Sequence, residues 1–158
     1  MALWMHRGED MEETEKIVDL NGQFRFKIDA KGRMSLPAKF RKDLDKDLVV
    51  TKDPMFDCLR VFVQKDFNAW VARMLEEKLG KFNESDKQHV AMRRWFKKNA
   101  EDVEIDSTNR ILLPADQRNL VGITKDVVIV GNTGYFEVWD AQRFDDMNAE
   151  YDFDAMFG

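Results

Sequence analysis

The sequence is poor in the residues that make disulfide bonds, metal sites and catalytic triads. Its 158 residues include one cysteine, Cys58, and two histidines, His6 and His89. A single thiol excludes an internal disulfide framework and a cysteine-rich zinc site. Neither histidine has the spacing of a metal ligand or of a triad. We expect Cys58 to be a buried, inert thiol, and this cysteine usage points to the cytoplasm.

Long apolar runs and a secretory leader are also missing. The longest uncharged stretch, residues 127–136, is about half the length needed to cross a bilayer. No basic segment followed by an apolar run and small residues is present at the start, so neither a membrane partner nor export is expected. With three prolines and eight glycines, the composition is globular and excludes collagen-like and low-complexity classes.

The charge is negative in total but uneven along the chain. The net charge is −5, and acidic residues gather in residues 9–15 and 140–158. By contrast, residues 23–42 contain seven basic residues and one acid, and residues 87–98 contain five basic residues and no acid. Such runs are most often solvated faces. A basic body with acidic ends can still bind a polyanion, because local potential steers encounter more than total charge does.

The most informative feature is an internal repeat at an offset of 77 residues. Residues 28–38, IDAKGRMSLPA, align with residues 105–115, IDSTNRILLPA. The alignment slips slightly and then returns, with LRVF at 59–62 over FEVW at 136–139. Two copies of about 45 residues therefore have the same order of elements.

Each copy predicts a strand, a turn, a strand, a short helix, a strand, a turn and a strand. Apolar residues alternate with charged ones before the first turn, which is the period of a half-buried strand. Gly32 and Asn109 suit turns that need positive φ. Pro37 and Pro114 fit the first position of a short helix. A second hairpin follows in each copy, over residues 48–63 and 127–139.

Helical spacing of apolar residues predicts two helices between the copies and one after them. The first helix covers residues 66–79 with Asp66 as its cap, and the second covers residues 85–98 with a Ser85–Gln88 capping box. The third begins after Asp140. We expect the aromatic stripes to pack in the core rather than hold a cofactor. The two linking helices are expected to form either subunit contacts or packing between the copies.

These patterns predict the organisation of the chain. The sequence leaves open whether the aromatic tail docks onto a surface or stays loose. The expected segments are an acidic, disordered extension at residues 1–19, a first repeat at 20–67, linking helices at 68–99, a second repeat at 100–144 and an acidic aromatic tail at 145–158.

Each copy places an aspartate and an arginine four residues apart across its first turn: Asp29 with Arg33, and Asp106 with Arg110. Because both residues flank a two-stranded hairpin, their side chains can lie on one side and pair. The simplest interpretation is a hydrogen bond that pins the turn. Repetition in register favours a second role, in which the aspartate orients the loop and basic groups face a polyanion. The planar fork of arginine suits phosphate or guanine.

Three stretches resemble the MraZ family: NGQFRFKIDAKGRMSLPAKFRKDL, NAEDVEIDSTNRILLPADQRNLVGITKDVVIVG and the following YFEVWDAQRF. This family consists of bacterial transcriptional regulators built from two copies of the AbrB-like (SpoVT-AbrB, looped-hinge-helix) DNA-binding unit. The resemblance covers residues 20–144. It implies an α+β, mainly β fold, in which two swapped-hairpin, double-psi-like units are related by a pseudo-two-fold axis and joined by helices.

The resemblance also implies a function. It implies a sequence-specific DNA-binding regulator of the division and cell-wall gene cluster, cytoplasmic and nucleoid-associated, without a cofactor, metal or small-molecule substrate. Its partners would be double-stranded DNA of its own promoter and identical subunits in a closed ring. The second loop reads Ser-Thr-Asn, so we expect it to bind DNA more weakly. Carried over by position, Arg33 and Arg110 read bases, Asp29 and Asp106 orient the loops, and Lys31, Asn109, Arg25 and Lys27 contact phosphate or the groove.

Two other function classes compete with this interpretation. An enzyme would use Asp29 and Asp106 as an acid pair, but no nucleophile with its base and no glycine-rich phosphate loop accompany them. An AbrB-like antitoxin or protein-interaction module is the stronger rival. Such antitoxins usually have one copy of the unit and a disordered tail that wraps a partner. The intact duplication and the short tail favour the regulator, while a protein that docks on residues 151–157 stays an alternative.

Overall fold

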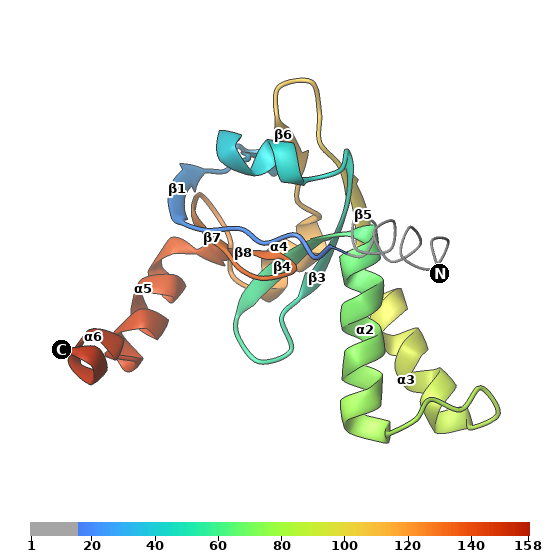
Figure 1. Cartoon of the computed structure of the whole chain (residues 1–158). Coiled ribbons are helices and arrows are strands. Elements are labelled where there is room, and N and C mark those ends of the chain that lie inside the picture. The colour runs from blue at the N-terminus through green and yellow to red at the C-terminus, as the bar shows by residue number, and fades with distance from the viewer. Residues whose placement is uncertain (1–15) are drawn as a thin grey trace, which may run out of the picture.

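The computed structural model describes residues 16–158, so the expectation of disorder at residues 1–19 falls mostly outside the described part. A six-stranded sheet and a two-stranded ribbon form the body, and helices lie against the sheet and extend from it (Figure 1). The strands are β1 (Gln23–Lys27), β2 (Arg33–Ser35), β3 (Asp47–Lys52), β4 (Cys58–Val63), β5 (Glu101–Glu104), β6 (Arg110–Leu112), β7 (Asp126–Gly131) and β8 (Phe136–Asp140). The helices are the 3-10 helix η1 (Ala38–Asp43), then α2 (Gln64–Leu79), α3 (Lys87–Lys98), α4 (Ala115–Leu120), α5 (Ala141–Glu150) and α6 (Phe153–Phe157).

The two repeats exchange their first strands. In the sheet order β1-β7-β8-β4-β3-β5, β1 of the first repeat pairs with β7 of the second, and β5 of the second pairs with β3 of the first. The strands β2 and β6 pair with each other in the separate ribbon. All of these pairings are antiparallel. This architecture confirms the predicted α+β, mainly β fold of duplicated, swapped units.

In each repeat, one predicted hairpin forms and the other does not. The strand pairs β3–β4 and β7–β8 are the expected hairpins. At the first turn, the Asp29 amide donates to the Arg33 carbonyl (3.0 Å), and then β1 and β2 diverge to partners in the other repeat. The prediction of a two-stranded hairpin at this turn is wrong. Alternation specifies the buried face of a strand but not the strand with which it pairs.

Strand register shows that a pseudo-two-fold axis relates the repeats. Met34 pairs with Ile111 at the centre of the ribbon, and Arg60 pairs with Glu137 where β4 meets β8. Both pairs join positions separated by the 77-residue offset of the sequence repeat. The axis therefore passes through the ribbon and through the middle of the sheet. It places the two Asp-x-x-x-Arg loops symmetrically about the ribbon.

The main core lies between the ribbon and the inner face of the sheet. Met34, Ile111, Phe40 and Phe136 are all buried there. The ring of Phe40, on η1, meets Phe24 edge-on at 5.3 Å and Phe136 at 5.7 Å between centroids. Because the inner side chains of the ribbon belong to this core, the ribbon is anchored to the body.

Helices cover the outer face of the sheet in two places. Phe67 of α2 and Phe96 of α3 belong to one buried cluster with Phe62 of β4, which confirms that these aromatic residues are core. For Trp95, in the same stripe of α3, the expectation is wrong, because its side chain faces solvent and is 51% exposed. At the other end, Phe144 of α5 packs on Trp139 of β8, with 5.7 Å between centroids. From there α5 and α6 lead away from the body (Figure 1). No helix within residues 16–158 has both the length and the apolar character needed to span a bilayer.

Helix starts match the sequence-based expectations only in part. Asp140 caps α5 as expected. Helix α3 is capped by Asp86 instead of Ser85. Helix α2 begins before Asp66, which is buried in its first turn and accepts a hydrogen bond from the Val18 amide (3.0 Å). The prolines that precede η1 and α4 occupy the cap position rather than the first helical position.

The ribbon register predicts that substitutions at two adjacent positions change the free energy of unfolding by very different amounts. Ile111→Ala should lower the free energy of unfolding by roughly 2–5 kcal/mol, because it empties a buried core position. Leu112→Ala should change it by only about 0.5 kcal/mol, because that side chain is 53% exposed. Urea denaturation of both variants measures the difference. Similar losses at the two positions would contradict the register.

Candidate nucleic-acid interface

In the first loop, Asp29 organises the turn through both of its carboxylate oxygens. Oδ1 accepts hydrogen bonds from the amides of Lys31 (3.0 Å) and Arg33 (2.9 Å), and Oδ2 accepts one from Arg33 Nε (2.7 Å). The short side chain of aspartate suits this geometry, since it reaches amides two residues ahead. These contacts, the Arg33 amide first among them, hold the pKa of Asp29 below its usual range. The carboxylate fixes both the turn and the adjacent arginine.

The second loop repeats this geometry with a looser contact to its arginine. Asp106 Oδ1 accepts hydrogen bonds from the amides of Thr108 (2.9 Å) and Arg110 (3.0 Å), and from the Thr108 hydroxyl (2.9 Å). Arg110 Nε lies 3.3 Å from Asp106 Oδ2 and, although it is buried, makes no hydrogen bond with any residue from 16 to 158. Partial desolvation raises the pKa of Asp106, but the hydrogen bonds outweigh it, so this pKa also lies below its usual range.

The residue before each arginine has a left-handed backbone. Gly32 has φ 93° and Asn109 has φ 61°, and glycine and asparagine are the residues that adopt this conformation most readily. A Cβ at Gly32 would lie 2.8 Å from the Arg118 guanidinium, which would have to move to accommodate it. The Asn109 side-chain amide donates to the Leu36 carbonyl (3.1 Å). That bond ties the second loop to the first repeat.

Strand register places both arginines on the outer face of the ribbon. The central pair of the ribbon points into the core, so by alternation Arg33, Ser35, Arg110 and Leu112 point outward. We call these four residues the ribbon face. Arg33 pairs with Leu112 and Arg110 with Ser35, so the arginine Cα atoms lie roughly 8 Å apart on a diagonal. Ser35 and Leu112 were not predicted as site residues, although the alternation that continues past each arginine could have identified them.

The pairing leaves hydrogen-bond donors of the arginines available. Of the three guanidinium nitrogens of Arg33, Nε donates to Asp29, and within residues 16–158 the two terminal Nη groups have no hydrogen-bond partner. The Arg33 side chain is 38% exposed and that of Arg110 is 33% exposed. A guanidinium held at Nε presents its two terminal nitrogens in a fixed orientation. Phosphate oxygens and the guanine edge accept that arrangement.

The remaining predicted contacts divide into two groups. Lys31 is exposed in the first loop, close to the ribbon face. Arg25 and Lys27 lie on β1 instead, where Arg25 pairs with Asp145 of α5 (2.6 Å) and Lys27 pairs with Asp126 of β7 (3.2 Å). The structure therefore brings Lys31 together with the reading candidates, whereas carboxylates outside the first repeat neutralise the two basic residues of β1.

Comparison with known proteins identifies the family. A family model described as "MraZ protein, putative antitoxin-like" matches residues 20–89 and 96–156, which include both loops and the ribbon. The chain belongs to the MraZ family.

Relatives of this MraZ-family chain carry the name "Transcriptional regulator MraZ". The one from Symbiobacterium thermophilum is 39% identical over 129 residues, which cover 82% of this chain and 89% of the relative. The one from Ligilactobacillus salivarius is 38% identical over 135 residues (84% and 90%), and that from Natranaerobius thermophilus is 36% identical over 124 residues (78% and 82%). These names are those of regulators, in agreement with the expectation that the chain is not an enzyme.

A second polar cluster of this MraZ-family chain lies on the outer face of the sheet, away from the loops. Asp53, Cys58 and Glu137 bring atoms of metal-ligand type within 4.8 Å of one another. Arg60 Nε donates to Asp53 (2.6 Å), and its guanidinium lies 4.2 Å from the ring centroid of Tyr135. Burial raises the pKa of the Cys58 thiol and of Glu137. Because Arg60 already supplies positive charge and burial disfavours thiolate, the cluster suits a structural role better than a cation site. Cys58 is buried, as expected.

Close packing at Gly32 leads to a stability prediction. Gly32→Ala should lose roughly 0.5–1.5 kcal/mol more than Gly80→Ala, because its new methyl group displaces the Arg118 guanidinium, 2.8 Å away, from the hydrogen bond that Arg118 Nε donates to the Leu113 carbonyl. Gly80 is the matched control, since it also has positive φ but has no atom within 4 Å of an added Cβ. Chemical denaturation of both variants isolates the steric contribution. Equal losses would show that the guanidinium gives way freely.

The lowered pKa of Asp29 predicts a dependence of stability on pH. A carboxylate whose pKa is lower in the folded chain than in the unfolded chain stabilises the folded state at pH values above its ordinary pKa, which is 3.8 for Asp29. This contribution is lost as the pH falls through the folded value. Asp29→Asn should therefore be less stable than the parent near neutral pH, and the difference should shrink as the pH falls below about 4. Thermal unfolding at several pH values measures it, and a constant difference would speak against a role for the charge.

Proposed function

We propose that this chain is a sequence-specific DNA-binding transcriptional regulator that lays its ribbon face in the major groove of DNA. The observation that carries the proposal is the strand register that sets Arg33 and Arg110 on one outer face. A two-stranded ribbon fits the major groove, where an arginine reads O6 and N7 of guanine through two hydrogen bonds. The relatives named as transcriptional regulators support the same class of function.

In this proposal the two loop aspartates position the arginines and do not contact DNA. A free carboxylate near DNA would be repelled by phosphate, but its pairing with a guanidinium offsets that charge. Asp29 occupies Nε of Arg33 and leaves the terminal nitrogens for a base. Ser35 supplies a hydroxyl that donates or accepts, and Leu112 supplies an apolar contact for a thymine methyl group. The ribbon face thus contains every type of group that distinguishes base pairs in the major groove.

Phosphate contacts come from exposed basic side chains beside the ribbon face. Lys31 lies next to it, and η1, which carries three exposed basic residues, lies beside the ribbon (Figure 1). Such contacts fix the register of the protein on DNA and supply most of its salt-dependent affinity. Arg25, Lys27 and Asn109 take secondary places in the proposal, because each already has a partner within the chain.

The proposal includes self-assembly into a closed ring of identical chains. One ribbon face offers only a few base contacts, so a single chain would bind weakly. A ring that meets several short repeats raises affinity through effective concentration. We propose the chain's own promoter in the division and cell-wall gene cluster as the target, and a cytoplasmic, nucleoid-associated location.

Alanine substitutions of arginine test the ribbon face directly. Arg33→Ala should weaken binding to a duplex from the region upstream of the gene by roughly 10-fold or more, with the oligomeric state unchanged. Arg110→Ala should weaken binding less, because Thr108 stands in its loop where the first loop has Lys31. Arg73→Ala removes the same charge from an exposed position on α2 and serves as the control. Fluorescence anisotropy measures affinity, and light scattering measures size.

The salt dependence of duplex binding distinguishes a DNA-binding regulator from a protein-interaction module. The parent should lose affinity steeply as salt rises, because bound counterions are released from phosphate, and a scrambled duplex should bind more weakly. Parental affinity in Arg33→Ala, or equal losses in all three variants, would contradict the ribbon face as the reading surface. No affinity for this duplex at any salt concentration would favour the protein-interaction module.

A further inference from the structure

We propose that the C-terminal arm of one copy docks into a groove beside α3 of a second copy. The arm is residues 141–158, and its tip is residues 151–158. The groove, here the α3–α4 groove, lies between the end of α3 and helix α4. The inference rests on the self-assembly in the proposed function and names the two surfaces that join the copies.

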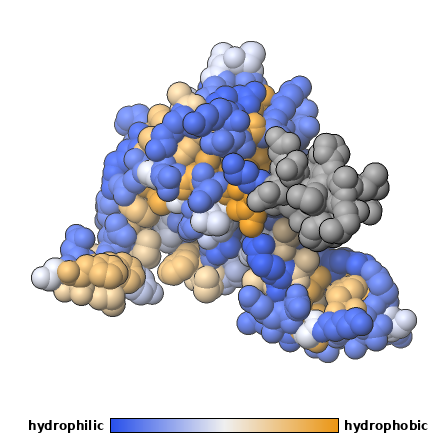
Figure 2. Space-filling view, viewed as in Figure 1, coloured by the Kyte–Doolittle hydropathy of each residue, from blue (hydrophilic) through white to orange (hydrophobic). Residues whose placement is uncertain are grey.

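The arm tip exposes a cluster of large apolar side chains. Tyr151, Phe153, Met156 and Phe157 are between 46% and 84% exposed, and the rings of Tyr151 and Phe153 stack on each other, 6.0 Å between centroids. Figure 2 shows apolar surface gathered at the end of the arm. A five-residue helix such as α6 has little stability by itself in water. An exposed apolar cluster on so short a helix is typical of a segment that is completed by a partner.

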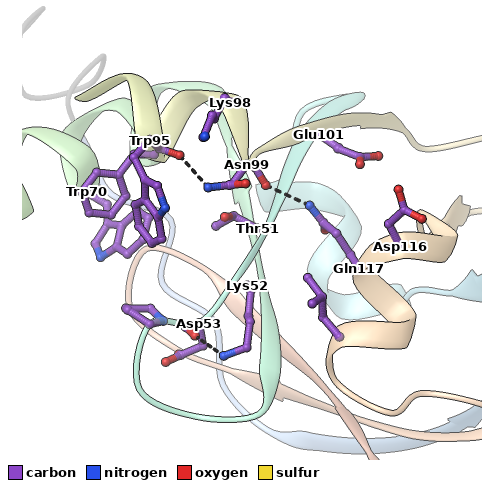
Figure 3. Close-up of a pocket in the computed structure, with 13 residues that line it drawn as sticks. Thr51, Lys52, Asp53, Trp70, Trp95, Lys98, Asn99, Glu101, Asp116 and Gln117 are labelled. Carbon is purple, nitrogen blue, oxygen red and sulfur yellow. Dashed lines mark hydrogen bonds between the residues drawn. The ribbon is translucent and has the colours of Figure 1, made fainter. Parts of the chain in front are cut away.

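The α3–α4 groove offers apolar side chains of matching kind. It has a volume of about 630 Å³. Trp95 of α3 and Leu120 of α4 line it and are 51% and 60% exposed. The buried Gln117 donates to the Asn99 carbonyl (3.1 Å), which joins α4 to the residue after α3. Figure 3 shows Trp95 and Trp70 on one side and Gln117 on the other. Helical elements and a partly buried hydrogen bond therefore define the groove.

The charges on the arm tip and on α3 are complementary. Glu150, Asp152 and Asp154 surround the apolar residues of the tip. Lys98 lines the groove, and Arg94 lies one turn before it on the same face of α3. No carboxylate within residues 16–158 forms an ion pair with either of these basic side chains. An acidic apolar segment therefore fits beside α3.

Two acids of the groove set the direction of docking. Glu101 and Asp116 lie on the side formed by β5 and α4, so that side repels the acids of the arm. Two further charged residues of the groove, Lys52 and Asp53, lie at the end of β3, where Lys52 donates to the Asp53 carbonyl and the Asp53 carboxylate is paired with Arg60. The carboxylates of the arm tip are therefore directed towards α3, and its rings enter between Trp95 and Leu120.

The arm and the groove of one chain lie on different sides of the body. Figure 1 shows α5 and α6 extending on one side, and α2 and α3 on the other. The base of the arm is fixed, because Phe144 of α5 packs on Trp139. The arm tip thus reaches the groove of a neighbour and not its own. A contact between two different surfaces is head-to-tail, and its repetition closes a ring when the rotation permits.

Substitutions in the full-length chain test both surfaces. The double variant Phe153→Ser/Phe157→Ser and the groove variant Leu120→Ser should each raise the concentration at which half of the chains are assembled by about tenfold or more. Met55→Ser is the control, since Met55 is 73% exposed and lies outside the groove. Light scattering over a dilution series measures the assembled mass. Parental assembly in the arm variant or in the groove variant overturns the inference.

A charge exchange tests the pairing of the two surfaces. Lys98→Asp and Asp154→Lys should each weaken assembly, because each places two like charges against each other where the arm tip meets α3. The two substitutions together should restore assembly, because opposite charges then meet again with their positions exchanged. A misfolded variant cannot give such a rescue. A combined variant that assembles no better than the single variants overturns the inference.

A peptide measurement separates the failure of this inference from that of the proposed function. A labelled peptide of residues 148–158 should bind the Phe153→Ser/Phe157→Ser chain saturably, and adding Leu120→Ser should abolish that binding. Absence of peptide binding, with DNA affinity intact, overturns the inference and leaves the DNA-binding proposal standing. A parent chain that stays single at every concentration overturns both this inference and the proposed ring. If Leu120→Ser loses assembly but Phe153→Ser/Phe157→Ser does not, the groove binds a segment other than the arm, and the inference is overturned.

Discussion

The pairing of β2 with β6 is the contact on which the arrangement of the molecule depends. Its central residues, Met34 and Ile111, are buried in the core, so the residues on either side of them must face outward. The two strands come from different repeats, and neither repeat can position its loop without the other. Burial of apolar side chains thereby fixes where two charged surface groups point. Hydrophobic packing is well suited to this task, because a register shift by one residue would bury the charges and expose the core.

Local chemistry was predictable from the sequence, and long-range pairing was not. The Asp-x-x-x-Arg turn depends on a side chain reaching amides two and four residues ahead, so spacing alone was enough to predict the pairing of Asp29 with Arg33. Strand exchange between the repeats was expected only from the family resemblance. The predicted cap at Asp66 was wrong because α2 begins two residues earlier, and the Asp66 carboxylate instead accepts from the amide of Val18, 48 residues away. No local pattern contains such a contact.

The pseudo-two-fold symmetry fails in the side chains where its axis crosses the sheet. Arg60 and Glu137 occupy equivalent positions and face each other across the axis, yet they carry opposite types of side chain. A buried guanidinium is costly unless it is paired. Asp53 at 2.6 Å and the ring of Tyr135 at 4.2 Å provide that compensation. Asp53 and Arg60 both belong to the predicted hairpin at residues 48–63. Their burial was not predictable, because it depends on the distant elements β8 and α2, which place Glu137 and Trp70 beside Arg60.

The two loops of the chain are alike in shape and different in chemistry, with Lys31 in one and Thr108 in the other. Two identical polypeptides related by true symmetry would present the same loop twice and could be turned around on a duplex without any change. When the two repeats are fused in one chain and their loops differ, the two orientations of that chain on a duplex are no longer equivalent. In the proposed ring, the loop with Lys31 would always precede the loop with Thr108 in the same sense from subunit to subunit, so the ring would bind DNA in one preferred orientation.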